Sequence, residues 1–271
     1  MLILRNIKIE KIVQMSASKK PILSVLIITL NEERHIKSLL ENIDFADEII
    51  VIDSFSTDKT VEIIKQFNDV KLIQNQFINY TSQRNFAIDQ AKNNWILFID
   101  ADEIVTPELK AEILATIQDK DAANAYLIHR TFMFKNKKLQ FSGWQTDKIF
   151  RLFKKSDCRY NEDRIVHEKL IVNGKIATLK HKIIHFSYTS FEDYKLKMYN
   201  YGVLKAQEKI KKGQKQSYLK MVFHPLYTFL YQFLIRLGFL DGFRGITICY
   251  LNAYSVFIRY KELRRISASK I

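Results

Sequence analysis

The sequence predicts an α/β fold, in which a mostly parallel sheet with helices on both faces is followed by an α+β half and a helical C-terminal region. Three observations support this prediction. Continuously apolar runs alternate with segments of helical periodicity from residue 24 to about residue 120, as in a buried parallel sheet. Turn-separated strand patterns then replace the alternation. From residue 190 onward, helical periodicity dominates.

Strands and helices alternate in the first half of the chain. The predicted strands are residues 24–29, 48–53, 71–73 and 95–100. Apolar residues recur at helical spacing over residues 36–43 and 61–67, and Thr81 can begin a third helix. Thr106 and Pro107 place a cap and an N1 proline at the start of a fourth helix. Strands separated by helices of this length predict a sheet that is covered on both faces.

The second half of the chain shows strands first and helices afterwards. Strand patterns cover residues 125–130, 132–141 and 149–153 and flank Asn173–Gly174. Ser190 and Asp193 resemble a capping box, Gly213 ends the helix that follows, and a second helical region runs from residue 217 to about 261. We therefore predict a leader (1–20), one domain (21–189) with halves at 21–120 and 121–189, and a basic helical region (190–271).

Length and composition indicate a globular chain in a reducing compartment. The 271 residues, 47% of them hydrophobic, are sufficient for a substantial core. Cys158 and Cys249 lie far apart and show no metal-ligand spacing, which argues against a disulfide framework and against a zinc site. Charged residues interrupt the apolar residues of the first twenty positions, so we read them as a leader or edge strand rather than a signal peptide.

Positive charge is concentrated in the C-terminal third, which is also rich in aromatic residues. Residues 195–271 contain fifteen Lys and Arg against three acidic residues, so this third carries most of the net charge of +14. Residues 221–240 are as long as a membrane span, but Arg236 within them would cost about 2.5–3.5 kcal/mol at a bilayer centre. We therefore expect this segment to lie in the interface of an anionic membrane, with a soluble helical pair as the alternative.

Polar residues follow three of the predicted strands. The predicted strands end at Thr29, which Glu32 follows closely, at Asp53, and at the pair Asp100 and Asp102. Taken singly, each can be a helix cap or a turn former. Ligands of open parallel sheets bind at the carboxyl ends of strands, and two carboxylates separated by one small residue suit a hard cation such as Mg²⁺ or Mn²⁺.

Several motifs together resemble a known family. The segments SVLIITLNEE, EIIVIDSFSTDKT, SQRNFAI and WILFIDADE, in this order and spacing, are similar to the successive motifs of family 2 glycosyltransferases of the GT-A type. The later segments RLFKK, RIVHEKL, HFSY and GFLDGFRG are similar to the subgroup that contains lipopolysaccharide core β-glucosyltransferases. The resemblance covers nearly the whole chain beyond residue 20.

This resemblance implies roles for individual residues. It implies a nucleotide-sugar site made of Thr29, Glu32, Asp53, Arg84 and Asp100, in which Arg84 approaches the diphosphate. It also implies that Asp102 holds a divalent metal together with Asp100. Ser54 and Phe55 stand where many relatives have an acidic residue and a glycine, which leaves open how the base is recognised.

Direct displacement at a sugar carbon also requires a base that takes the acceptor proton. The candidates are Glu162, Asp163 and Glu168. We favour Glu168, which lies in the RIVHEKL motif, and keep Asp163 as the alternative. His185 follows an apolar pair and is a further candidate metal ligand, although a histidine in such a strand is more often a core residue.

The function that the resemblance implies is an inverting transfer of a sugar, expected to be a hexose, from a nucleotide-diphosphate sugar to a glycolipid such as lipopolysaccharide core. We expect the protein to act peripherally at the cytoplasmic face of the inner membrane. The alternatives are a polyprenyl-phosphate glycosyltransferase and a non-catalytic membrane-surface binding module. A nucleotidyltransferase would need a glycine-rich basic loop after the first strand, and the apolar density of the basic region argues against nucleic acid.

Overall fold

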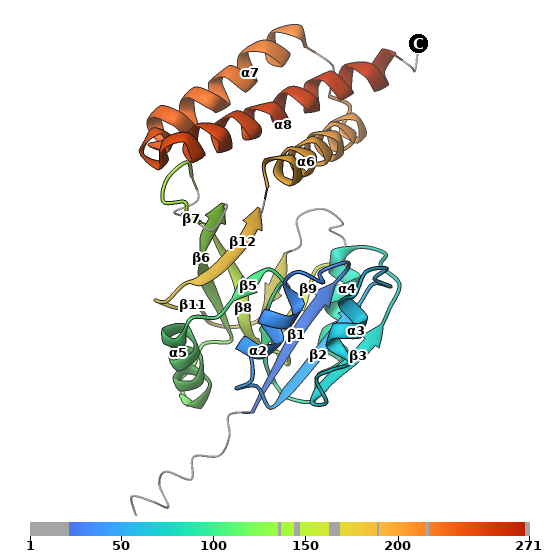
Figure 1. The fold of residues 1–271 in the computed structure, drawn as a ribbon, viewed down its shortest axis with the longest axis vertical. Helices are drawn as coiled ribbons and strands as arrows, with labels where there is room; N and C mark the ends of the chain where they lie inside the picture. Colours follow the sequence, from blue (N-terminus) through green and yellow to red (C-terminus); the bar gives the residue numbers. More distant parts are fainter. Residues whose placement is uncertain are drawn as a thin grey trace, which may run out of the picture. The chain divides into compact units, whose positions relative to one another are not determined.

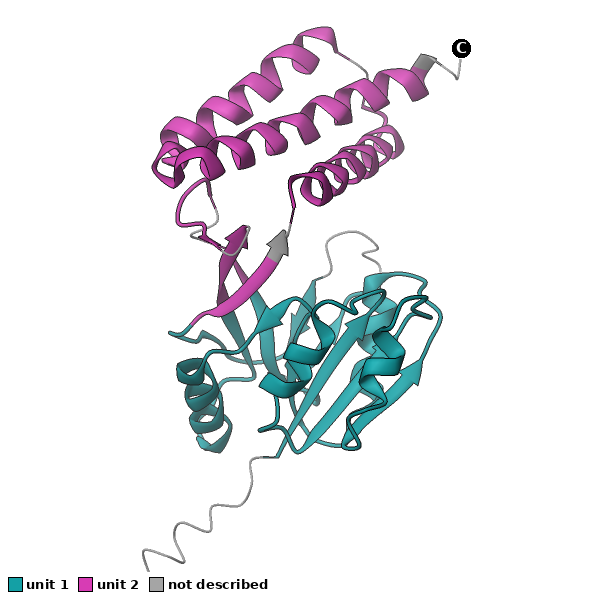
Figure 2. Ribbon diagram, in the orientation of Figure 1, with its two compact units in different colours: residues 1–128, 149–181 teal, residues 129–148, 182–271 magenta. Residues whose placement is uncertain are grey.

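The computed structural model describes residues 22–134, 137–143, 147–162, 169–188, 190–214 and 217–268. Two compact units make up the chain, as Figure 2 shows. Unit 1 comprises residues 1–128 and 149–181, and unit 2 comprises residues 129–148 and 182–271. The predicted leader, residues 1–20, lies outside the described residues. The predicted boundary at residue 190 stays a prediction.

Unit 1 is built on a mostly parallel sheet (Figure 1). The strands of this sheet are, in spatial order, β3 (Val70–Gln74), β2 (Glu48–Asp53), β1 (Leu23–Thr29), β4 (Trp95–Phe98), β8 (Lys148–Lys154) and β6 (Ala125–Phe134). Residues 129–134 of β6 and Lys148 of β8 are counted with unit 2. Parallel pairing joins β3, β2, β1 and β4, whereas β8 is antiparallel to β4. Thr29 lies directly opposite Asp53 in the register of β1 and β2. This arrangement confirms the predicted fold class.

The helices of unit 1 connect these strands. They are α2 (Ile36–Asn42), α3 (Thr60–Ile64), α4 (Tyr80–Gln90) and α5 (Pro107–Gln118). Thr106 caps α5 through its side chain, and a proline fills the first position of the helix, as predicted. The cap of α4 is Asn79, whose side chain accepts a hydrogen bond from the Ser82 amide. This cap starts α4 at Tyr80, one residue before the predicted start.

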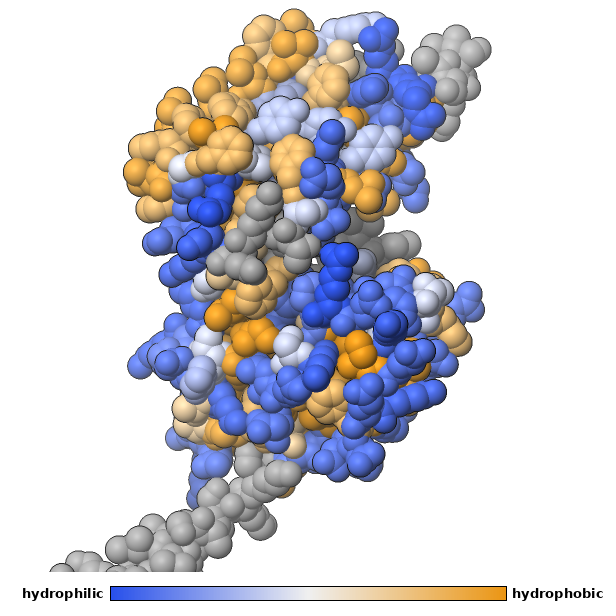
Figure 3. Space-filling model, viewed as in Figure 1, coloured by the Kyte–Doolittle hydropathy of each residue, from blue (hydrophilic) through white to orange (hydrophobic). Residues whose placement is uncertain are grey.

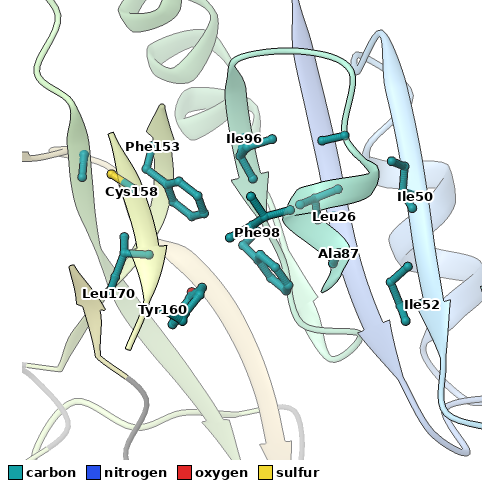
Figure 4. Packing of buried hydrophobic residues seen from close by; sticks show 13 residues of the cluster. Leu26, Ile50, Ile52, Ala87, Ile96, Phe98, Phe153, Cys158, Tyr160 and Leu170 are labelled. Atoms are coloured by element: carbon teal, nitrogen blue, oxygen red, sulfur yellow. The ribbon is translucent and has the colours of Figure 1, made fainter. Parts of the chain in front are cut away.

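The core of unit 1 covers both faces of the sheet. Consecutive residues of β1, Val25, Leu26 and Ile27, are all fully buried, although successive side chains of a strand point to opposite faces. On one face, residues of β1, β2, β4 and β8 pack against α4 and against the small strands near residue 160, as Figure 4 shows. Continuous burial of this kind explains why the parallel strands read as unbroken apolar runs.

The remaining strands lie in the loop after β4 and in the second half of the chain. They are β5 (Glu103–Ile104), β7 (Lys137–Lys138), β9 (Cys158–Tyr160), β10 (Leu170–Val172), β11 (Ile176–Thr178) and β12 (Ile183–Tyr188). Strands do flank Asn173–Gly174, as predicted, but β10 pairs with β9, whereas β11 pairs with β6. Gly174 has φ +126°, and a Cβ there would lie 2.4 Å from the side chain of Asn124, so this turn requires glycine.

Unit 2 is mainly helical. Its helices are α6 (Phe191–Lys211), α7 (Tyr218–Leu230), a π-helical turn (Tyr231–Ile235), a 3₁₀ turn (Gly238–Asp241) and α8 (Gly242–Ala268). The Ser190 side chain caps α6 and Gly213 lies just beyond its end, as predicted. Gly202 lets α6 approach α8 closely, since a Cβ there would lie 2.7 Å from the Ser255 carbonyl oxygen.

Helix α7 exposes its apolar side chains. None of its residues is buried, and Leu219, Phe223 and Leu226 are between 51% and 70% exposed. Figure 3 shows hydrophobic residues gathered over this helix. Among the described residues, no helix combines the length and the apolarity that crossing a membrane requires.

Candidate active site

The loops that follow β1 and β2 are interlocked. The Ser54 amide donates to the Thr29 carbonyl oxygen at 2.9 Å. Asn31, with φ +56°, donates its amide to the Ser56 hydroxyl and accepts the Thr57 amide on its side chain, both at 2.8 Å. Asparagine is among the few side chains that tolerate this left-handed conformation. The two strand ends therefore form one rigid platform.

Asp53 lies at the centre of this platform. It is fully buried, and its carboxylate accepts hydrogen bonds from the amide and hydroxyl of Ser56 and from Gln74. Through these hydrogen bonds, the Asp53 carboxylate holds the turn after β2 in place. Thr29, opposite Asp53, is 4% exposed, and its hydroxyl has no hydrogen-bond partner within the described part of the chain. A buried hydroxyl of this kind is costly unless a ligand or water satisfies it, which marks the end of β1 as a candidate binding position.

Glu32 and His35 form a pair in the loop after β1. The Glu32 carboxylate lies 3.0 Å from Nδ1 of His35, and the Glu32 amide donates to the Thr60 hydroxyl at 2.8 Å. The pKa of His35 is raised above 6.5, chiefly by the hydrogen bond with Glu32 and also by the negative charge of Asp102, although burial acts against the shift. The largest cause of the raised pKa, the hydrogen bond with Glu32, lies within the loop after β1 itself.

A cluster of four charged residues occupies the end of β4. Asp100 accepts a hydrogen bond from Arg84 at 3.0 Å and pairs with Arg151. Arg151 also binds Glu103 at 2.6 Å. Glu103 closes the turn, because its carboxylate accepts the Asp100 amide and its own amide donates to the Asp100 carbonyl oxygen. The turn that carries Asp102 is thus held from both sides.

Burial makes this cluster energetically important. Arg151 is 2% exposed, Glu103 is fully buried, and Arg84 is 7% exposed. Burial alone would lower the pKa of the Arg151 guanidinium, but the charges of Asp100 and Glu103 raise it above its ordinary value. Two cations and two anions neutralise each other, which is the condition under which buried charges are tolerated.

Arg84 is held on a second side by aromatic rings. Its guanidinium carbon lies 4.5 Å from the centre of the Phe98 ring and 5.6 Å from that of Tyr160. The neighbouring Asn85 exchanges two hydrogen bonds of 3.0 Å with the backbone of Tyr160. Stacking and hydrogen bonding together fix the guanidinium before any ligand arrives.

The predicted site residues of unit 1 are therefore brought to adjoining strand ends. Thr29 and Asp53 face each other across β1 and β2, and β4, which leads to Asp100, is the other neighbour of β1. Asp102 is partly exposed. No group of three or more His, Cys, Asp or Glu side chains that could hold a metal ion occurs within the described residues.

The remaining candidates are His185 and the three carboxylates proposed as the base. His185 belongs to β12 in unit 2, where it is 8% exposed, packs against Phe132 with ring centres 5.1 Å apart, and lies 3.4 Å from Arg130. Glu168 and Asp163, the predicted base and its alternative, lie outside the described residues. Glu162 is described: it is exposed, and its carboxylate accepts a hydrogen bond of 3.2 Å from Asn85.

Sequence reasoning missed Arg151 and Glu103. Arg151 lies inside the apolar run of β8, and Glu103 is the last residue of the IDADE segment. A charged residue within an otherwise apolar strand is a signal for a buried ion pair, since such a residue is almost never buried without a partner. That signal was present in the RLFKK segment, but the partner could only be identified in three dimensions.

Comparison with known proteins decides the family. The family model described as glycosyl transferase family 2 matches residues 24–177, more than half of the chain. This chain belongs to glycosyl transferase family 2. An uncharacterized glycosyltransferase of Rickettsia bellii is 33% identical over 256 residues, which cover 90% of this family 2 chain and 87% of the relative.

Two other relatives carry more specific names. The lipopolysaccharide core biosynthesis glycosyltransferase LpsC of Rhizobium meliloti is 26% identical over 88% of this chain and 93% of its own length. The glycosyltransferase SunS of Bacillus subtilis is 42% identical over 99 residues, 35% of this chain. The predicted family is confirmed, and so is the similarity to a lipopolysaccharide core enzyme.

One solved structure with a similar fold is that of TarS from S. aureus. The S. aureus TarS fragment in complex with UDP is 17% identical over 92% of this chain and 91% of its own, with a TM-score of 0.46.

Proposed function

We propose that this protein transfers a hexosyl group, with inversion, from a nucleotide-diphosphate sugar to a membrane-bound glycolipid such as lipopolysaccharide core. One observation carries the proposal. In a chain of glycosyl transferase family 2, Thr29, Asp53 and the Asp100–Glu103 turn meet at the carboxyl ends of adjoining parallel strands. Ligands of such sheets bind at these ends.

The donor site in this proposal is preformed. Thr29 and Glu32 contact the base and ribose, and Asp53 acts mainly by holding the Ser56 turn that shapes their pocket. Arg84 faces the diphosphate. Asp100 acts through Arg84, because the ion pair of 3.0 Å fixes the guanidinium. A guanidinium fixed in this way loses little entropy when it binds a phosphate oxygen.

A divalent metal, Mg²⁺ or Mn²⁺, is part of the proposal. The donor atoms at the end of β4 are carboxylate oxygens, which suit these ions. Asp102 would hold the metal, with Asp100 as a second ligand whose carboxylate is already engaged by two guanidinium groups. We keep His185 as a third candidate ligand. When bound, the metal would neutralise charge that develops on the departing diphosphate.

The transfer itself needs one base. The acceptor hydroxyl oxygen attacks the anomeric carbon of the sugar, the bond from that carbon to the diphosphate oxygen breaks, and the hydroxyl proton moves to the base. We propose Glu168 as this base, with Asp163 as the alternative. Substitution Glu168→Gln should abolish transfer and leave nucleotide binding intact, whereas near-normal turnover would refute the assignment.

The proposed acceptor is supported by a relative, and the proposed cellular location is supported by the surface of the protein. LpsC is named for lipopolysaccharide core biosynthesis, and it aligns with most of this chain. The exposed apolar side chains of α7 and the basic C-terminal third suit the surface of an anionic membrane, which we propose to be the cytoplasmic face of the inner membrane. A polyprenyl phosphate acceptor would fit the same surface and differs only in the product.

The experiment measures nucleoside diphosphate release from a panel of sugar nucleotides, with membrane extract present and absent, in Mn²⁺, Mg²⁺ or EDTA. The proposal expects release from one or a few donors that depends on both metal and extract. The labelled product then distinguishes a glycolipid from a polyprenyl phosphate. A protein that binds membranes but shows neither turnover nor nucleotide affinity would instead be a non-catalytic binding module.

A further inference from the structure

An open groove lies between α7 and α8 in unit 2. Its volume is about 490 Å³, and it is lined by Leu219, Lys220, Phe223, His224, Tyr227 and Tyr260. The lining is mostly apolar, although the groove is open to solvent. Leu219, Phe223 and Tyr227 are 70%, 61% and 62% exposed. Apolar side chains gathered in one exposed patch are typical of a surface that binds a non-aqueous partner.

The floor of the groove is rigid. The Tyr260 hydroxyl lies 2.9 Å from Nδ1 of His224, and the two ring centres are 5.6 Å apart. Tyr260 is 5% exposed and packs in a cluster with Ala206, Val256 and Leu263, which joins α6 to α8. The groove therefore keeps its shape without an occupant.

Three basic residues lie at or next to the groove. Lys220 belongs to the lining, the ammonium of Lys209 lies 5.8 Å from the centre of the Tyr260 ring, and Arg259 precedes Tyr260 in α8. Their charges act on one another: burial lowers the pKa of Lys209, and the charges of Arg259 and Lys220 lower it further. Burial and the same three cations also lower the pKa of His224.

These cations lack an anion to balance them. In the described part of the chain, none of Lys209, Lys220 and Arg259 forms an ion pair with a carboxylate, and Nε of Arg259 is buried with no hydrogen-bond partner. The nearby Glu208 is already paired with Lys205 and Lys212. The cluster is thus suited to an anion that comes from outside the chain.

We propose that this groove binds one anionic phospholipid of the membrane, with its phosphate at Lys209, Lys220 and Arg259 and an acyl chain along Leu219 and Phe223. The inference rests on the proposed function in that a membrane-bound acceptor requires the protein at the lipid surface. A free phosphate would leave the apolar wall in water. A second copy of the chain would bring two clusters of like charge together.

The first test removes the headgroup contacts. Binding of the full-length protein to phosphatidylcholine vesicles with and without phosphatidylglycerol is measured by co-sedimentation. Lys209→Gln with Lys220→Gln should weaken binding to the anionic vesicles about thirtyfold, or about 2 kcal/mol, since each basic side chain near such a surface contributes about 1 kcal/mol. The control pair, Lys65→Gln with Lys71→Gln, removes two exposed lysines of unit 1 and should change binding little.

The second test removes the chain contacts. Leu219→Ser with Phe223→Ser should weaken binding to the same vesicles at least about tenfold, because the wall then gains little from burial in lipid. Ile22 and Ile78 of unit 1, 59% and 79% exposed, provide the matched control when both are replaced by serine. All of these side chains are exposed, so the variants should fold, and the unfolding midpoint in urea verifies this.

Three results would overturn the proposal. One is a variant with Lys209→Gln and Lys220→Gln that binds anionic vesicles as well as the control variant does. Another is displacement of the protein by inorganic phosphate at the concentration of the lipid phosphate. A third is self-association in sedimentation that Leu219→Ser with Phe223→Ser abolishes, since the occupant would then be a second copy. Nucleoside diphosphate binding without vesicles tests the proposed function separately, so the two failures are distinguishable.

Discussion

The strand-end region of unit 1 and the surface of α7 in unit 2 show opposite patterns of burial. At the strand ends, charged side chains such as Arg151 and Glu103 are buried and paired, and their positions are fixed by short hydrogen bonds. On α7, apolar side chains such as Leu219 and Phe223 are exposed, and no residue of the helix is buried. Buried polar networks supply fixed geometry for chemistry, whereas exposed apolar faces supply attachment. Substitution of the buried charges should therefore lower stability, whereas substitution on α7 should weaken membrane binding and leave stability nearly unchanged.

The largest expected effect is that of Arg151→Met on stability. This change leaves Asp100 and Glu103 without their shared guanidinium, and breaking a buried pair typically costs about 3–5 kcal/mol. The free energy of unfolding in urea measures the loss. Lys148→Met in the same strand is the control, because Lys148 is exposed and should change stability by less than about 0.5 kcal/mol.

One outcome would refute the role of the buried charges. If Arg151→Met costs no more than Lys148→Met, the buried charges of unit 1 do not hold the strand ends together. A double variant, Arg151→Met with Glu103→Gln, refines the test: it should cost less than the sum of the single changes, because Arg151 and Glu103 share one interaction.

The next effect is on activity rather than stability. Asp102 is partly exposed, so Asp102→Asn should leave the unfolding free energy nearly unchanged. Turnover should fall about a hundredfold or more, which is the usual loss when one group that stabilises transition-state charge is removed. Asp69→Asn, at another exposed aspartate of unit 1, should retain full turnover. Equal activity of the two variants would remove Asp102 from the proposed mechanism.

The sequence predicted the strands that form the first region and the apolar surface of the second. Apolar runs such as residues 24–29 are informative because a strand buried on both faces needs continuous apolarity, and Thr106–Pro107 marked a helix start by local chemistry alone. The partners of Arg84 and Asp100 were not predictable, because an ion pair between α4 and the end of β4 depends on how the chain packs. The same holds for the separate pairing of β10 and β11 around Asn173–Gly174, which no local turn signal encodes.

A smaller effect is expected on α7. Val222→Ser with Leu226→Ser replaces two side chains that are 60% and 51% exposed, so each change should alter stability by less than about 0.5 kcal/mol. Binding to anionic vesicles should nevertheless weaken. The measurements are urea unfolding and co-sedimentation on the same preparations. A stability loss as large as that of a core substitution would mean that α7 is packed against protein in solution.

A further small effect is a pH dependence at His35. Its pKa is raised chiefly by the hydrogen bond with Glu32, so the bound proton stabilises the folded state below about pH 6.5, and this contribution disappears as pH rises through the folded-state pKa. The side chain is partly exposed, so we expect less than about 1 kcal/mol. Glu32→Gln should lower the pKa of His35 in an NMR titration. An unchanged midpoint would show that this pair does not hold the loop after β1.

In the proposed function, acidic side chains at adjoining strand ends bind a sugar nucleotide through a divalent metal. Calorimetric titration of a panel of sugar nucleotides into wild-type protein and Asp102→Asn, in Mn²⁺ or in EDTA and without membranes, tests it most directly. The wild type should bind a donor far more tightly in Mn²⁺ than in EDTA, and Asp102→Asn should lose this gain. Equal donor affinity of both proteins in Mn²⁺ and in EDTA would contradict it.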